Sequence, residues 1–165
     1  MNAIKRFFGH WKTVRHHRKL VRQFCFEQGL YWQGLTHDLS KYSPVEFWNG
    51  VKYFTGTASP HVGERAEKGH SDAWIHHHNH NKHHAEYWHD IVDGKSACVE
   101  IPHKYLVEMV ADRVAASKTY LKDAYVPEAP LNYYLTHMEE NEYHPKTREK
   151  LVYMLTAIAR GNKIF

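Results

Sequence analysis

Val14-Arg-His-His-Arg-Lys-Leu-Val-Arg-Gln-Phe24 is the stretch that most clearly indicates the fold class. Its apolar residues and one histidine recur at i, i+3, i+7 and i+10, a spacing that places them on one face of an α-helix. They are Val14, His17, Val21 and Phe24. The pattern predicts a helix from about Ile4 to Gln28. A histidine on an apolar face needs a polar partner, so His17 is either a hydrogen-bonded core residue or a ligand.

The same helical periodicity continues along the chain, and no segment alternates convincingly in the manner of a strand. Ser43-Pro-Val-Glu46 is typical of a helix start, with an N-cap, a proline at N1 and an acid at N3. Thr55–Gly69 is expected to be a long loop. The expected helices surround His37-Asp38 or cover about Ser43–Tyr53, Ser71–Val92, Pro102–Tyr125, Leu131–Glu140 and Pro145–Arg160. The sequence therefore predicts an all-α bundle of about six to seven helices.

Composition limits the class of protein further. The chain has 165 residues and 19.5 kDa, which fits a single domain over residues 1–165, and 42% hydrophobic residues are enough for a core. No apolar run approaches the roughly 18 residues of a membrane span, and the N-terminus lacks the apolar segment of a signal peptide. Cys25 and Cys98 form no Cys-x-x-Cys motif, so we expect a cytoplasmic protein without disulfides.

Histidine is the unusual component, with 16 residues in the chain. Two segments contain the most informative histidines. They are Thr36-His-Asp-Leu-Ser-Lys41 and Trp74-Ile-His-His-His-Asn-His-Asn-Lys-His-His-Ala-Glu-Tyr-Trp88. On one continuous helix, six polar residues of the second segment fan over one broad arc, while His78 and His89 point elsewhere. The six are His76, His77, His80, Asn81, His83 and His84.

A later helix adds Glu108-Met-Val-Ala-Asp112-Arg113, where Asp112 lies beside the apolar stripe. Each feature has an ordinary explanation when it is taken alone: a core histidine, a helix start, a histidine-rich surface tract or a surface ion pair. Together they place His, His-Asp, several His and Asp on separate helices. This ordered set is far more specific than its parts and predicts a metal site.

The set resembles the HD-domain superfamily of metal-dependent phosphohydrolases, whose His-Asp-x-x-Lys signature is similar to His37-Asp38-Leu-Ser-Lys41. The resemblance is closer to a small HD-like family and covers most of residues 14–121. Its motifs match four stretches of this chain: His17-Arg-Lys-Leu-Val21, Gly34 to Phe47, Trp74 to Trp88 and Pro102 to Arg113. The resemblance implies an HD-like helical domain with its metal-site core at about 14–121 and further helices at about 131–160.

By this resemblance, the core metal ligands are His17, His37, Asp38 and Asp112. Histidines of the intervening segment would make the site binuclear, with Asp38 as the bridge and His77, His83 and His84 as the ligands of a second ion. Four residues are expected to support these ligands from outside the metal site: His76, Asn81, Glu86 and Glu108. The family's motif does not require histidine at the positions of His78 and His80. Asp38 and Lys41 are the expected catalytic residues, with Lys41 neutralising a substrate phosphate. Nitrogen and oxygen donors without thiolate favour one or two ions of Mn, Fe, Co, Ni or Zn.

The preferred hypothesis is a phosphohydrolase that acts on a nucleotide or another small phosphate ester through a metal-activated water. The first alternative is an HD-type di-iron oxygenase, because the same scaffold and ligands suit iron and O₂. Two further alternatives are non-catalytic: metal storage, or nucleic-acid binding through the basic segment Lys12–Arg22. The sequence predicts no membrane partner and leaves the oligomeric state open.

Overall fold

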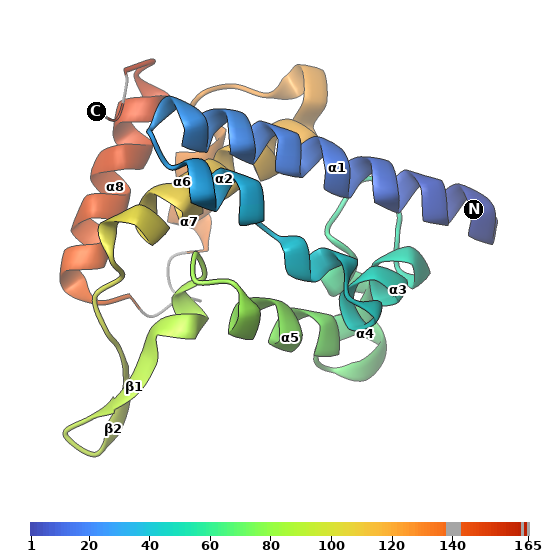
Figure 1. Cartoon of the computed structure of the whole chain (residues 1–165), viewed down its shortest axis with the longest axis horizontal. Helices are drawn as coiled ribbons and strands as arrows, with labels where there is room; N and C mark the ends of the chain where they lie inside the picture. Colours follow the sequence, from blue (N-terminus) through green and yellow to red (C-terminus); the bar gives the residue numbers. More distant parts are fainter. Residues whose placement is uncertain (138–142, 163, 165) are drawn as a thin grey trace.

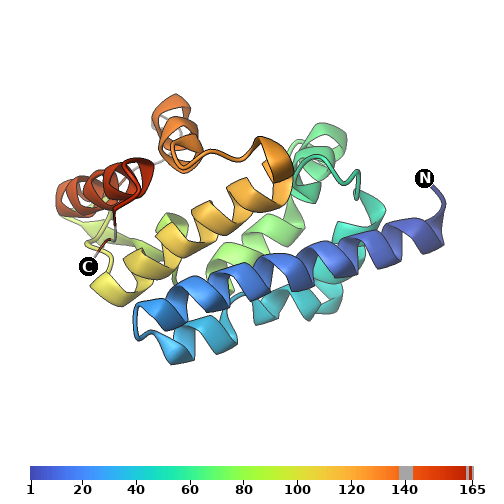
Figure 2. The same ribbon diagram turned by 90° about the horizontal axis from the view of Figure 1, so that it is seen from above.

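Helix α1 (Ala3–Glu27) packs along helix α6 (His103–Leu121), and the two helices form the centre of the fold (Figures 1 and 2). The structure is a computed structural model that describes residues 1–137, 143–162 and 164. Val21 and Cys25 of α1 meet Ala111 and Ala115 of α6 in a buried cluster. Small residues on α6 allow the two helices to approach closely, and this contact brings their polar positions together as well.

Eight α-helices are present in the described part of the chain, so the all-α prediction is confirmed. Their bounds are α1 Ala3–Glu27, α2 Tyr31–Thr36, α3 Pro44–Lys52, α4 Pro60–Lys68, α5 Asp72–His80, α6 His103–Leu121, α7 Ala129–Thr136 and α8 Pro145–Ala159. Three 3₁₀ helices and one hairpin connect them: η1 Leu39–Tyr42, η2 Ala85–Trp88, η3 Lys122–Ala124, β1 His89–Val92 and β2 Lys95–Cys98. Within the described residues, no helix is both long enough and apolar enough to cross a membrane.

The larger apolar core lies between α6, α7 and α8. Leu106 and Val110 of α6 pack with Leu151 and Leu155 of α8, and all four are almost completely buried. Tyr134 of α7 closes the cluster. This core holds the C-terminal helices against one side of α6 and leaves its other side to α1.

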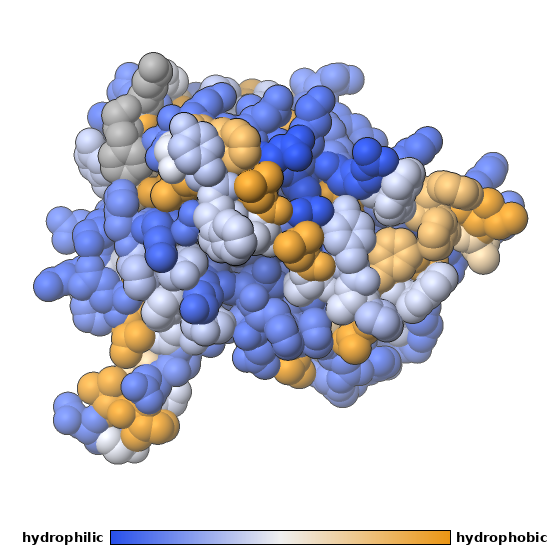
Figure 3. All heavy atoms as spheres, viewed as in Figure 1, coloured by the Kyte–Doolittle hydropathy of each residue, from blue (hydrophilic) through white to orange (hydrophobic). Residues whose placement is uncertain are grey.

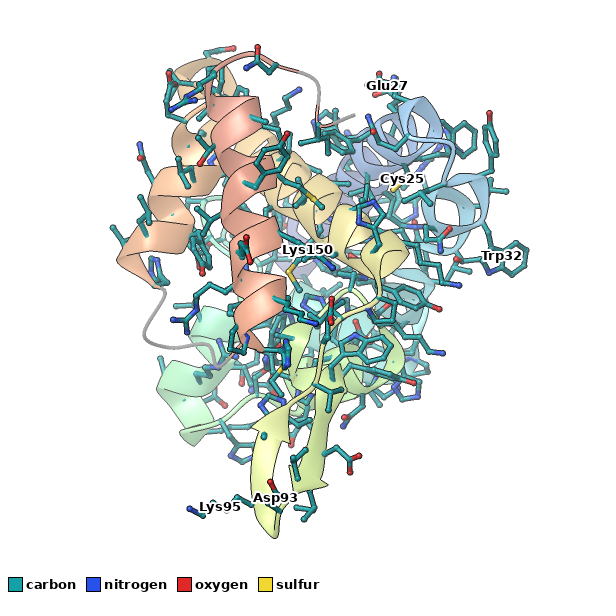
Figure 4. The ribbon with its side chains drawn as sticks, turned by 90° about the vertical axis from the view of Figure 1, so that its left-hand side faces the viewer. Cys25, Glu27, Trp32, Asp93, Lys95 and Lys150 are labelled. Carbon is teal, nitrogen blue, oxygen red and sulfur yellow. The ribbon has the colours of Figure 1, made fainter. Side chains whose placement is uncertain are left out.

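The predicted helix over Ser71–Val92 is wrong in its second half, because α5 ends at His80. The chain then turns into an antiparallel hairpin in which His89 pairs with Cys98 and Val92 with Lys95. Asp93 and Gly94 have φ values of 51° and 76°, the positive angles that a tight two-residue hairpin turn requires. Figure 4 shows Asp93 and Lys95 at the tip of this hairpin, which projects from the helical body.

The predicted loop over Thr55–Gly69 is also wrong, because it contains helix α4. Pro60 starts this helix and Gly69 ends it with a φ of 79°. Glu64 is buried and accepts hydrogen bonds from Ser71 and Lys68, which a loop reading could not anticipate. Near the C-terminus, α7 ends at Thr136, and the expected end of that helix at Glu140 lies outside the described residues.

His10 predicts an acid sensitivity of the fold. Its imidazole is buried against the rings of Phe47 and Phe54 and against Gly50, where an added Cβ would overlap it. Burial, and then the charge of Lys41, lower the pKa of His10 to about 4.

The unfolded chain protonates His10 near its ordinary value of about 6.5, while the folded chain does so only near pH 4. Stability from this residue is therefore lost as the pH falls between these two values. Between pH 7 and pH 5, denaturant titrations should show that the wild type loses about 1–2 kcal/mol more free energy of unfolding than His10→Gln. Equal losses in the two proteins would contradict the assignment.

Candidate metal centre

His37 and Asp38 lie at the break between α2 and η1, not inside a helix as predicted. Helix α2 ends at Thr36, and Asp38 adopts the left-handed conformation with φ 53° and ψ 29°. Aspartate tolerates this conformation better than most residues with a Cβ. Both side chains are buried, and His37 Nε2 lies 3.3 Å from Asp38 Oδ2. The reversal of the chain thus turns both side chains toward the interior.

A first donor set, meaning a group of side chains whose nitrogen and oxygen atoms could bind one metal ion, joins α1, the His37-Asp38 turn and α6. His17 Nε2 lies 2.9 Å from Asp112 Oδ1 and 3.6 Å from Asp38 Oδ2. His37 Nε2 lies 3.4 Å from His17 Nε2 and 3.6 Å from Asp112 Oδ1. These four residues each offer a donor atom, and the four atoms lie within 4.8 Å of one another. The structure therefore brings together the set that the sequence predicted for the first ion.

A second donor set shares Asp38 but uses its other oxygen. Asp38 Oδ1 lies 3.3 Å from His77 Nε2 and 3.5 Å from His83 Nε2, and His84 completes the group. Asp38 Oδ1, His83 Nε2 and His84 Nε2 are buried polar atoms without a hydrogen-bond partner. Buried polar atoms nearly always have a hydrogen-bond partner, so three buried atoms without one in the same group need a common binding partner. A divalent ion between them would be that partner, and this donor set fits one.

The residues of the second donor set reach Asp38 by a chain path that differs from the continuous helix predicted for this segment. Helix α5 ends at His80, and Asn81 is extended, with φ −126° and ψ 108°. The Asn81 side-chain amide donates to His77 O and to Ser40 Oγ, both at 2.7 Å. A turn closed by His84 N donating to Asn81 O then carries His83 and His84 back to Asp38. The predicted residues meet, with Asn81 holding the end of the helix.

Two buried carboxylates orient the histidines from outside. Glu108 Oε1 accepts from His37 Nδ1 at 3.0 Å and lies 3.3 Å from His83 Nδ1, as the sequence predicted for a supporting residue. Glu46 accepts from His77 Nδ1 at 2.8 Å and from His76 Nδ1 at 2.7 Å. A carboxylate on Nδ1 fixes the tautomer that leaves Nε2 free as a ligand. Sequence reasoning missed Glu46 because its place at N3 of α3 already explained it as a capping residue.

The electrostatics of the cluster favour bound cations. Burial raises the pKa of Asp38, but His37 and Lys41 outweigh this and hold it well below its usual range. Burial likewise raises the pKa of Asp112, and hydrogen bonds from His17 and His37 hold it well below. The carboxylates are therefore ionised in a buried site, which is stable only with opposite charge nearby.

The surroundings shift the pKa values of His84 and Lys41 in opposite directions. Burial, and then the neighbouring His83 and His77, lower the pKa of His84 well below its ordinary value, so its imidazole is neutral and has a free lone pair. Burial lowers the pKa of Lys41, but Asp38 and Asp112 outweigh it and raise the pKa above its ordinary value. Lys41 Nζ lies 2.6 Å from Asp38 Oδ2, so its charge is held at the carboxylate that the two donor sets share.

The remaining polar residues of the histidine segment lie outside both donor sets. His80 contacts its own helix by donating to His76 O at 2.7 Å, and the ring of His78 lies 6.0 Å from that of Trp74. Glu86 makes no hydrogen bond or ion pair with the cluster in the part of the chain that the structure describes. Its charge acts on His78 and Tyr143 instead.

Glu46→Gln should weaken metal binding at the second donor set while it leaves the fold intact. Glutamine keeps the size of the side chain, but it removes the charge that polarises His77 and fixes its tautomer. We expect the affinity for one of two bound ions to fall by about 10–100-fold in a titration with a chelator. Glu149→Gln, on the exposed side of α8, is the matched control. Equal affinities in the two variants would mean that Glu46 only packs against α5.

Comparison with known proteins gives one finding. No match was found among curated proteins or among solved structures. The model of a family of unknown function, DUF5662, matches residues 6–157, which include both donor sets and the carboxylates behind them. The chain therefore belongs to the DUF5662 family.

Proposed function

We propose that this protein is a metal-dependent phosphohydrolase that cleaves a phosphate ester of a nucleotide or another small molecule. One observation carries the proposal: the two carboxylate oxygens of Asp38 face two different groups of metal-binding side chains. Such a bridging carboxylate is typical of sites that hold two ions a few Å apart. Two-ion sites of this kind serve phosphoryl transfer because the ions can act on both the attacking and the leaving oxygen.

The chemistry of the donors supports a transition metal. The first group offers two imidazoles and two carboxylates, and the second offers three imidazoles with the shared carboxylate. Neither group contains a thiolate. Imidazole-rich sites of this composition suit Mn, Fe, Co, Ni or Zn better than Mg or Ca, which prefer oxygen ligands alone. When bound, such ions would lower the pKa of a water molecule and polarise a phosphoryl oxygen.

The residues that reach solvent suggest how a substrate would approach. Asp38 and His37 are fully buried, whereas the side chains of Lys41 and Asp112 are 25% and 20% exposed to solvent. A phosphate would therefore arrive between η1 and α6, where the Lys41 ammonium can neutralise one of its charges. Tyr120 is close enough for the Lys41 and Asp112 charges to affect its pKa, and it would form part of the same entrance.

The decisive experiment is elemental analysis of the purified full chain, followed by phosphate release from a panel of nucleotides. We expect up to two transition-metal ions per chain, hydrolysis of at least one phosphate ester, loss of activity with a chelator and recovery when metal is restored. Bound metal without turnover of any phosphate ester would favour metal storage. Bound iron with O₂ consumption would favour the di-iron oxygenase, an outcome that the three imidazoles of the second group also suit.

A further inference from the structure

A second feature with binding chemistry lies on the outer side of α1. A groove of about 330 Å³ runs between α1, α2 and η1. Four of its lining residues are cations of α1, namely Arg15, Arg18, Lys19 and Arg22. The remaining lining residues are His16, Gly34, Leu35 and Tyr42. The volume is within the range of small-molecule sites.

The groove is separate from the metal centre. Its four cations follow one another at i, i+3, i+4 and i+7, which gathers them on one side of the helix at about 100° per residue. The same rotation places them away from His17, which points into the metal centre from the opposite side of α1. Figure 3 shows strongly hydrophilic side chains beside apolar ones on this face of the molecule. One side of α1 thus faces the metal centre, and the opposite side carries the four cations of the groove.

The positive charge of the groove is not neutralised within the protein. None of the four cations forms an ion pair with a carboxylate in the described residues. Arg15 and Arg18 stack on aromatic rings instead, those of Trp11 and Tyr42. Residues 1–45 contain eight Lys and Arg but only two acids, Glu27 and Asp38, and Asp38 is buried in the metal centre. Like charges at i, i+3 and i+4 destabilise a helix, so their concentration here points to an anionic ligand.

We propose that this groove binds the phosphate groups of a phosphorylated ligand, at a site distinct from the metal centre. The guanidinium groups of Arg15 and Arg22 offer the planar paired donors that match phosphate oxygens. Arg18 adds its positive charge while its Nε and Nη2 bind backbone carbonyls, and Lys19 adds a point charge. Leu35 and Tyr42 form an apolar wall for the organic part of the ligand. Trp32, one turn before Leu35 on α2, is 72% exposed and points outward at the edge of the molecule in Figure 4.

Arg18 links the groove to the metal centre. Its Nε donates to His37 O at 2.8 Å, and its Nη2 donates to Leu35 O at 3.0 Å. The guanidinium therefore holds the backbone of a metal-binding residue while it lines the groove. Substituting Arg18 would disturb both sites, so the test uses Arg15 and Arg22.

The test is calorimetric titration of the full chain with inorganic pyrophosphate in the presence of a chelator. The double variant Arg15→Gln/Arg22→Gln should bind pyrophosphate at least about tenfold more weakly than the wild type. The control Lys5→Gln/Lys12→Gln removes the same charge from exposed positions of α1 outside the groove and should bind as the wild type does. Asp38→Asn should also bind normally, which separates this site from the proposed phosphohydrolase centre.

Two further experiments, with lipid vesicles and with an oligonucleotide, test which kind of molecule supplies the phosphate. Co-sedimentation with phosphatidic acid vesicles, compared with phosphatidylcholine vesicles, tests a lipid headgroup. Binding of either probe that is lost only in the Arg15/Arg22 variant supports the proposal and names the source. Equal losses in both double variants, loss in Asp38→Asn alone, or no binding of either probe would overturn it. Preference for an oligouridylate that pyrophosphate cannot displace would also overturn it and indicate a nucleic-acid surface.

Discussion

Asp38→Asn is expected to remove both bound ions and to reduce hydrolysis by at least about 10³-fold. Asparagine has the same size as aspartate and tolerates the left-handed conformation of this position, so the turn between α2 and η1 can be kept. It has no charge, however, and one of its two terminal atoms is a donor that cannot bind a cation. Both donor sets therefore lose their common ligand at once.

Metal content measured by elemental analysis, together with phosphate release, checks this prediction. The helical circular-dichroism signal should persist, because the apolar core between α6, α7 and α8 does not involve Asp38. Asp123→Asn is the matched control: Asp123 is exposed in η3 and should retain full metal content and activity. Full occupancy of both sites in Asp38→Asn would show that Asp38 does not bridge them.

The parts of the fold that the sequence predicted well are those with local causes. Helices α1, α3 and α8 begin and end within one or two residues of the expected bounds, because periodicity and capping residues act over a few positions. The hairpin formed by β1 and β2 was not predicted. Its strands are only four residues each and mostly exposed, so they lack the alternating apolar pattern that reveals longer strands.

The candidate site shows a different limit of sequence reasoning. The family resemblance implied that His83 and His84 are ligands, and a continuous helix was expected to present them. They do reach Asp38, but through the turn that follows Asn81. Glu46 was missed because its contact with His77 spans 31 residues of sequence. No local pattern distinguishes a capping acid from one that also supports a ligand on a distant helix. Contacts between elements, more than motifs, therefore decide which acids belong to the site.

His17→Gln and His84→Gln are expected to remove one ion each, and different ones. His17 belongs only to the donor set with His37 and Asp112, while His84 belongs only to the set with His77 and His83. Each variant should retain about one ion per chain and lose at least about 10²-fold in hydrolysis, because a two-ion mechanism needs both. The double variant should lose both ions, as Asp38→Asn does. The measurement is metal stoichiometry of the three variants beside their rates of phosphate release.

His78→Gln is the control that makes this result specific, because His78 lies one residue from His77 on α5 but belongs to neither donor set. It should keep both ions, since its ring lies near that of Trp74 and the charges that act on it are those of Glu86, Arg65 and His89. If His78→Gln lost as much metal as His84→Gln, the ions would be held by the histidine tract as a whole. If the wild type held a single ion and His17→Gln and His84→Gln each lost it, the two donor sets would form a single site around one cation. Retention of one ion in each single variant would instead require two sites that share Asp38, which is the arrangement its two oxygens present.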